Sequence, residues 1–151
     1  MVRLYAMEAP PPLSTRTLRD AEGAETTLAA YQGDVLVVNL WATWCAPCME
    51  EMPSLAELQR NFEGRIRVIP VSVDSEADRA KAIAELQRLS EFSLPFLQDM
   101  TRGVLFDVQA AGMPVTIIYD RNGQELARLA VGADWASEDA ARLIEAVLAE
   151  E

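Results

Sequence analysis

Runs of apolar residues, separated by polar breaks, divide the chain into alternating strands and helices. Residues 35–41 are rich in valine and leucine, which is typical of a buried central strand. Residues 65–73 repeat this pattern after a break at Gly64. Between the two strands, apolar residues recur at helical spacing over about residues 46–62, and Pro53 should kink that helix because proline removes an internal hydrogen bond. The first half of the chain therefore predicts a strand–helix–strand unit.

The remaining elements follow from turn and capping signals. Ser75 is a suitable N-cap for a second long helix, and a last helix begins near Ser137. Glycines at 23 and 123 mark the turns of two β-hairpins. The predicted ranges are 15–20 and 24–28 for the first hairpin, 94–97 for a short strand, 103–108 for a short helix, and 115–119 and 125–131 for the second hairpin. Strands separated by helical crossovers predict an α/β fold with a mixed central β-sheet covered on both faces.

Domain organisation follows from the N-terminal segment. Residues 1–13 hold three consecutive prolines and little periodicity, so we expect an extended N-terminal arm there. Residues 14–151 are then one domain, which is long enough to bury a core of its own. No signal peptide is visible at the start of the chain, and the longest apolar run is too short to cross a bilayer.

Charge and composition exclude several classes of function. The net charge of −11 argues against nucleic acid or an anionic membrane surface as the main partner. The chain contains no histidine, which excludes histidine-based acid–base catalysis, Ser–His triads and the usual histidine-containing metal sites. We therefore expect no metal and no cofactor, and the chemistry must rest on the two cysteines and on carboxylates.

The two cysteines form the motif Cys45-Ala46-Pro47-Cys48, which follows the predicted buried strand and opens a helix. Unpaired N–H groups and the helix dipole at this position favour the thiolate of Cys45. Cys48 lies one turn further along the same face, so the two sulfurs can meet. We expect Cys45 to be exposed and to attack a disulfide of another protein, and Cys48 to be more buried and to resolve the mixed disulfide.

Other interpretations of the cysteine pair compete with the redox one. It can be a structural disulfide, half of a zinc site shared with a second subunit, or two core residues, but so small a loop stabilises little and the chain offers no further ligand of the usual kind. Two functional alternatives stay open. A non-catalytic chaperone would hold Cu(I) on the two thiolates, and a peroxiredoxin-like peroxidase would need a Pro-x-x-x-Thr-x-x arrangement before its cysteine, which Cys45 lacks.

The motifs resemble those of the thioredoxin superfamily, and in particular its TlpA/ResA/DsbE-like branch. The segments that carry the resemblance are Trp41-Ala42-Thr43-Trp44-Cys45-Ala46-Pro47-Cys48, Pro53, and Gly112-Met113-Pro114-Val115-Thr116. Asn39 stands where cytosolic thioredoxins carry a buried aspartate, and Glu51 follows Cys48 by three residues. The resemblance implies a thioredoxin fold with an N-terminal β-hairpin and an inserted αβ segment between about residues 74 and 108.

The resemblance also implies roles for single residues. It gives Glu51 a proton-exchange role with Cys48, for which we expect a buried carboxyl with a raised pKa; position alone equally allows an ordinary surface glutamate. Trp44 and Pro47 would contact the substrate. Met113 and Pro114 would form a cis-proline loop that pairs with substrate main chain, although most X-Pro bonds are trans.

At the level of the cell, the resemblance implies an extracytoplasmic or periplasmic reductant of protein disulfides, of the kind that serves cytochrome c maturation or copper-site assembly. Its partners would be proteins with disulfides or dithiols and an upstream thiol protein that donates electrons. A membrane tether would require an N-terminal anchor outside this chain.

Overall fold

Eight strands form one mixed sheet in the computed structural model, which describes residues 2–4 and 9–150. The strand order is β1-β8-β7-β4-β5-β6-β2-β3. The strands are β1 (Val2–Leu4), β2 (Leu18–Asp20), β3 (Glu25–Thr26), β4 (Val35–Trp41), β5 (Ile66–Ser72), β6 (Leu97–Gln98), β7 (Val115–Tyr119) and β8 (Glu125–Leu129). The helices are α1 (Ala46–Asn61), α2 (Arg79–Ser90), α3 (Gly103–Asp107) and α4 (Glu138–Ala149), with short 3₁₀ turns η1 (Leu28–Tyr31) and η2 (Glu76–Asp78).

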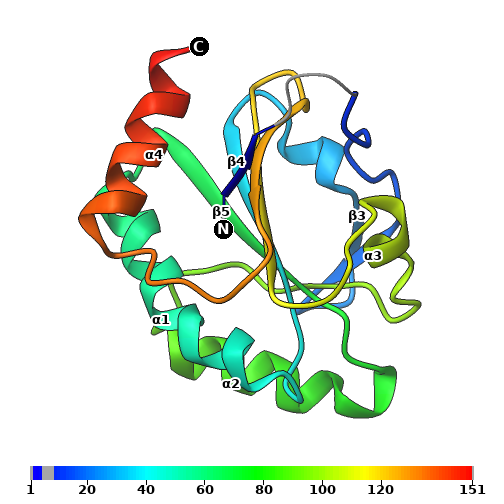
Figure 1. Ribbon diagram of the computed structural model, residues 1–151. Helices are drawn as coiled ribbons and strands as arrows, with labels where there is room; N and C mark the ends of the chain where they lie inside the picture. Colours follow the sequence, from blue (N-terminus) through cyan, green and yellow to red (C-terminus); the bar gives the residue numbers. More distant parts are fainter. Residues whose placement is uncertain (1, 5–8, 151) are drawn as a thin grey trace.

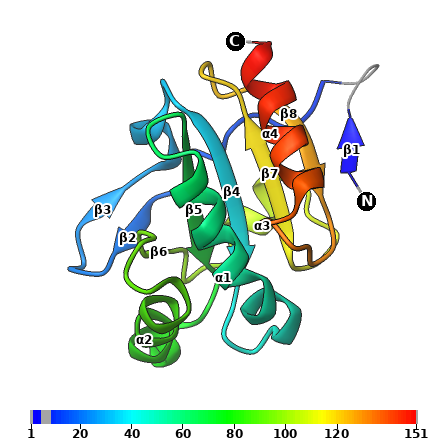
Figure 2. The same ribbon diagram turned by 90° about the vertical axis from the view of Figure 1, so that its left-hand side faces the viewer.

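The central strand β4 is buried along its whole length, as its apolar sequence predicts. It pairs in parallel with β5 and antiparallel with β7. The sheet is seen nearly edge-on in Figure 1, where α1 and α4 cover one face and α3, with the chain before β4, covers the other. Figure 2 shows α1 and α4 side by side in front of the strands. The predicted fold, a mixed sheet with helices on both faces, is confirmed.

Helix α1 begins where the motif predicts. Cys45 is its N-cap in an extended conformation, and the proline of the first turn, Pro47, has no N–H that would need an intrahelical partner. The helix runs as one element through Pro53. Ser137 caps α4 as predicted, because its Oγ accepts a hydrogen bond from the Ala140 N–H at 3.2 Å.

Some predicted boundaries are wrong. Ser75 caps no long helix: its side chain makes no capping bond, η2 follows it, and α2 starts only at Arg79. The short strand predicted at 94–97 is β6 at 97–98, since Pro95 has no N–H for a ladder. Both strands of the first hairpin are shorter than predicted. Within the predicted N-terminal arm, β1 pairs antiparallel with β8, while residues 5–8 lie outside the described residues.

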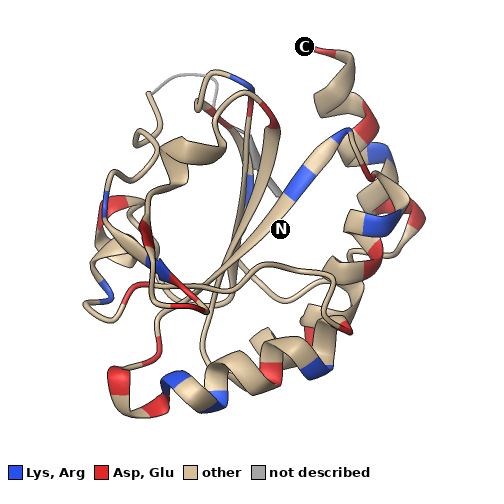
Figure 3. Ribbon diagram, turned by 180° about the vertical axis from the view of Figure 1, so that it is seen from behind, with Lys and Arg blue, Asp and Glu red and all other residues tan. Residues whose placement is uncertain are grey.

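Charges of both signs lie along the outer helices. Acidic and basic residues both lie on α2 and on α4 in Figure 3, so these helices present surfaces of mixed charge. Among residues 2–4 and 9–150, no helix combines the length and the apolar character that a membrane span requires.

Candidate functional site

The two cysteines form a disulfide at the start of α1, at the end of the central strand. Their Cα atoms are 5.3 Å apart, as expected for residues one helical turn apart. Cys48 is fully buried, and Cys45 keeps 7% of its surface exposed. The predicted order of exposure therefore holds, but Cys45 is less exposed than expected because its side chain turns inward to bond Cys48.

Glu51 lies on the same helix one turn beyond Cys48, and its side chain is only 4% exposed. Its Oε1 accepts a hydrogen bond from Asn39 Nδ2 at 2.8 Å. Its Oε2 accepts from the Ala133 N–H at 3.0 Å and from Trp135 Nε1 at 3.1 Å. Burial raises the pKa of Glu51, and the three donors offset this only in part. The expected burial and raised pKa of this carboxyl are therefore both present.

Asn39 connects Glu51 to the middle of the sheet. Its Nδ2 also donates to Thr116 Oγ1 at 2.9 Å, which fixes the amide between β4 and β7. The Asn39 Oδ1 is buried and has no hydrogen-bond partner among the described residues. The amide group of Asn39 thus contacts the Glu51 carboxyl through its N–H donor. The three hydrogen-bond donors to this carboxyl are all uncharged groups.

A second buried carboxylate holds the turn that leads into Cys45. Asp74, two residues after the end of β5, accepts from the Thr43 N–H at 3.1 and 3.2 Å and from Thr43 Oγ1 at 2.6 Å. It also accepts from Ser72 Oγ at 2.6 Å and is fully buried. The Cys45 N–H closes the same turn on the carbonyl of Ala42 at 3.1 Å. The backbone just before the disulfide is therefore tied to the neighbouring strand.

The predicted cis-proline loop faces the start of α1. The Met113–Pro114 bond is cis, against the general preference for trans, and β7 begins at the next residue. Val115 pairs with Leu40 of β4, which places Pro114 at the edge of the sheet where Cys45 lies. Gly132 adjoins both prolines: a Cβ built on it would lie 3.6 Å from the Pro47 carbonyl and 3.9 Å from Pro114 Cγ.

The exposed parts of this region suit contact with a partner. Trp44 is 55% exposed and Pro47 is exposed, whereas Met113 is half-buried. A shallow pocket of about 500 Å³ lies beside Pro47 and is lined by Pro47, Glu50, Glu51, Ser54, Gly132, Ala133 and Asp134. Glu51 therefore adjoins an open pocket even though it is itself nearly covered.

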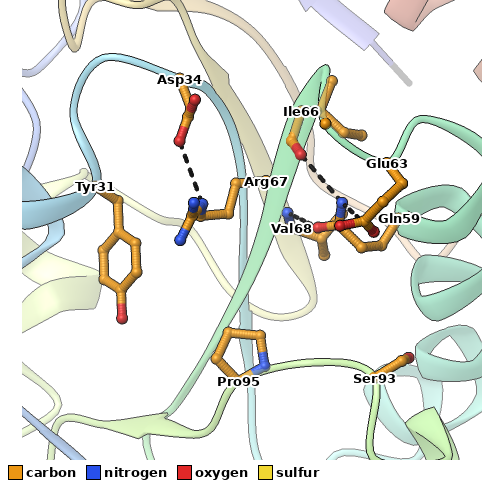
Figure 4. A pocket seen from close by; sticks show the side chains of 10 residues that line it. Tyr31, Asp34, Gln59, Glu63, Ile66, Arg67, Val68, Ser93 and Pro95 are labelled. Atoms are coloured by element: carbon orange, nitrogen blue, oxygen red, sulfur yellow. Dashed lines mark hydrogen bonds and ion pairs between the residues drawn. The ribbon is translucent and has the colours of Figure 1, made fainter.

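A second pocket, of about 460 Å³, lies at the opposite end of the parallel strands (Figure 4). Arg67 and Asp34 form an ion pair at 3.3 Å on one side of it, and Gln59 bonds the start of β5 on the other. It contains no part of the cysteine motif. Among the described residues, no three His, Cys, Asp or Glu side chains converge as a metal site requires.

The structure brings together all the site residues that the sequence singled out, but it adds others. Trp135, Asp74 and Thr116 enter the site from distant segments. No local pattern marks Trp135, because it acts through a side-chain contact across the fold. Asp74 carries a weak signal, as an acidic residue that follows a buried strand, and Thr116 belongs to the motif around Pro114 without being singled out there.

Comparison with known proteins places this geometry in a family. Residues 9–124 match the AhpC/TSA family. The chain is 30% identical over 131 residues to the thiol-disulfide oxidoreductase ResA of Geobacillus kaustophilus, which covers 86% of this chain and 72% of ResA. It is also 30% identical to the thioredoxin-like protein YneN of Bacillus subtilis, over 71% of this chain and 62% of that protein.

A solved structure matches nearly the whole fold. It is a protein from Chlorobium tepidum, described as a thiol:disulfide interchange protein DsbE, with a TM-score of 0.78 and 23% identity. The match covers 95% of this chain and 99% of the other, and at that identity it establishes the fold. The matched sequence and the shared architecture lead to one assignment: this chain belongs to the AhpC/TSA family, has the thioredoxin fold and is a relative of the thiol-disulfide oxidoreductase ResA.

Proposed function

We propose that the chain is a thiol–disulfide oxidoreductase that works through the Cys45–Cys48 pair. The observation that supports this most strongly is the placement of Cys45 as the N-cap of α1, bonded to a fully buried Cys48 one turn below. The start of a helix favours a thiolate, which is the reactive form in exchange.

Each exchange transfers two electrons. The Cys45 thiolate attacks a substrate disulfide, forms a mixed disulfide and releases one substrate thiolate. The Cys48 thiolate then attacks the Cys45 sulfur, which closes the 45–48 disulfide and releases the second substrate thiol. A dithiol protein must afterwards return two electrons to the pair.

Glu51 is proposed to exchange the proton of Cys48. A thiol inside the fold must lose its proton before it can attack, and a carboxyl with a raised pKa can take that proton and return it. The shallow pocket beside Glu51 offers a route between this carboxyl and solvent.

Four residues are proposed to contact the substrate. Trp44 and Pro47 flank the nucleophile on the exposed side. Met113 and Pro114 lie at the open end of β7, where their main chain can pair with an extended segment of the substrate.

We propose that the cellular role is the reduction of disulfides in extracytoplasmic proteins, as the family resemblance implies. The names of two relatives support the exchange chemistry itself: the thiol-disulfide oxidoreductase ResA and the thiol:disulfide interchange protein HelX of Rhodobacter capsulatus. We propose cytochrome c maturation or copper-site assembly as the setting. The direction of exchange in the cell depends on the reduction potential of the pair against its compartment.

The test uses the fact that the chain holds two cysteines and no more. We expect the wild-type protein to reduce insulin disulfides with dithiothreitol as donor, and Cys45→Ser to abolish this activity. Cys48→Ser should accumulate one mixed disulfide per chain, measured by mass under non-reducing conditions. A Cys48→Ser protein whose Cys45 reacts with iodoacetamide but never forms this adduct would contradict the proposal.

The same proteins test the two alternatives. Stoichiometric retention of Cu(I) by the reduced protein, without disulfide reduction, would favour the copper chaperone. Oxidation by hydrogen peroxide that outpaces oxidation by disulfides would favour the peroxidase. Trapping with Cys48→Ser in the native compartment then tests the setting, which recovery of apocytochrome c or a copper-site protein on Cys45 would support.

A further inference from the structure

Arg102 lies at the same edge of the sheet as the cysteine pair. Strands β4, β5 and β6 run parallel, so their carboxyl ends meet at one edge. Cys45 follows β4 there, and the segment 99–103 follows β6. This brings a segment more than 50 residues from the motif next to the turn that carries Trp44 and Cys45.

The backbone holds Arg102 in a conformation that arginine rarely adopts. Its φ is 62°, in the left-handed region. The buried carboxylate of Asp99 fixes the segment on both sides of it. Asp99 Oδ1 accepts from the Thr101 N–H at 2.9 Å and from Thr101 Oγ1 at 2.6 Å, and Oδ2 accepts from the Val104 N–H at 2.8 Å. These hydrogen bonds fix the backbone from which the Arg102 side chain extends.

The Arg102 side chain extends over the ring of Trp44. The guanidinium carbon lies 5.4 Å from the ring centroid, within cation–π distance. A guanidinium keeps its N–H donors in its own plane, so contact with a ring face leaves them free to bind a carboxylate. No carboxylate among the described residues pairs with Arg102, in a chain with 24 acidic and 13 basic residues.

The opposite side of the cysteine motif carries the opposite charge. Glu50 and Asp134 are exposed and line the shallow pocket next to Pro47. A substrate segment that lies across the motif therefore meets a cation on the Trp44 side and carboxylates on the Pro47 side. Electrostatic complementarity of this kind selects partners and their orientation.

On the basis of the proposed function, we infer that Arg102 and Trp44 form a docking contact for an acidic side chain of the substrate. The preferred substrates are protein segments with Asp or Glu close to the cysteine that Cys45 attacks, and with no acidic residue on the other side. Arg102 is a specificity-determining residue in this scheme.

The test compares three peptides that each contain one cysteine, which forms a mixed disulfide with 2-mercaptoethanol. The peptides differ in one residue near that cysteine, which is Asp, Asn or Lys. The readout is kcat/KM for the Asp or Lys peptide divided by kcat/KM for the Asn peptide. We expect the wild type to prefer Asp to Lys by about two- to five-fold at low ionic strength, as for an exposed ion pair, and less in 0.5 M salt. Arg102→Gln should remove the preference, and Arg102→Glu should reverse it.

The control is Arg142→Gln, which removes the same charge from α4, where Arg142 pairs with Asp139. This variant should keep the wild-type preference. An Arg102→Gln protein with an undiminished preference for Asp, or a wild type that reduces all three peptides equally, would overturn the inference. Failure of the wild type to reduce any of them would contradict the proposed function instead.

Discussion

Glu51 is the residue whose protonation most directly links the site to the stability of the fold. Its carboxyl is buried among neutral donors from β4 and from the segment after β8. Burial raises its pKa above the ordinary value of 4.5. At a pH between 4.5, the pKa in the unfolded chain, and the higher pKa in the folded protein, Glu51 is protonated in the folded protein and ionised in the unfolded chain. The contribution of Glu51 therefore makes the stability of the fold decrease as the pH rises through this range.

Replacing Glu51 with Gln should therefore remove the loss of stability that comes from burying an ionised carboxylate at higher pH. We expect the unfolding free energy of the wild type, relative to Glu51→Gln, to decrease from about pH 4.5 upwards and to level off above the raised pKa. Urea denaturation of the oxidised proteins over a pH series measures this. Glu50→Gln, on the exposed side of the same turn, is the matched control. If the unfolding free energies of wild type and Glu51→Gln diverged with pH no more than those of wild type and Glu50→Gln, burial of the Glu51 carboxyl would not be the cause of the pH dependence.

At the scale of elements, one half of β5 depends on a side chain for its pairing. β6 pairs with Val71 and Ser72 alone, so the first residues of β5 lack a strand on that side. Gln59 of α1 takes the place of the strand: its Oε1 accepts from the Val68 N–H at 2.6 Å, and its Nε2 donates to the Ile66 carbonyl at 3.0 Å (Figure 4). Pro70 points its N–H-free nitrogen to the same side, two residues further on. Gln59 and Pro70 together protect this edge from pairing with another chain.

Gln59→Ala should destabilise the protein by about 1–3 kcal/mol, because it leaves a buried N–H and a buried C=O without partners. Chemical denaturation measures the loss, and light scattering should show more association at high protein concentration through the opened edge. Gln87→Ala on α2 is the control and should change stability by no more than about 0.5 kcal/mol. Equal effects of the two substitutions would refute the pairing role of Gln59.

At the scale of the whole molecule, the site is assembled from strand, helix and loop residues in five parts of the chain: 39–51, 72–74, 99–103, 113–116 and 132–135. The central strand, the helix that starts at Cys45 and the capped α4 could be predicted because local patterns specify them. The bond from Trp135 to Glu51 joins residues 84 positions apart, and that from Thr43 to Asp74 joins residues 31 apart. Such contacts depend on which strands become neighbours, and a local pattern does not contain that information. The cis geometry of Pro114 was indicated by resemblance alone, since local preference favours trans.

Asp74 tests whether this assembly sets the reactivity of Cys45. Asp74→Ala removes the acceptor for the Thr43 N–H and for two hydroxyls, whereas Asp74→Asn keeps an acceptor oxygen and loses the same charge. Both variants lose the carboxylate charge, so a difference in stability or in Cys45 reactivity between them comes from the position of the turn and not from the charge. We expect Asp74→Ala to lose about 1–3 kcal/mol of stability relative to Asp74→Asn.

The reactivity of Cys45 should change with the position of that turn. If Asp74 positions Cys45 at the start of α1, Asp74→Ala lets the sulfur move away from the positive end of the helix dipole, which favours the thiol over the thiolate. In the Cys48→Ser background, the midpoint of iodoacetamide alkylation should then lie at higher pH for Asp74→Ala than for Asp74→Asn. Asp78→Ala is the control, because Asp78 lies four residues after Asp74 and its side chain makes no capping hydrogen bond. Its alkylation midpoint should equal that of the Cys48→Ser protein. Identical alkylation profiles for the Ala and Asn variants, despite a measured loss of stability, would mean that the helix start alone determines the state of Cys45 and that Asp74 serves only to hold the loop.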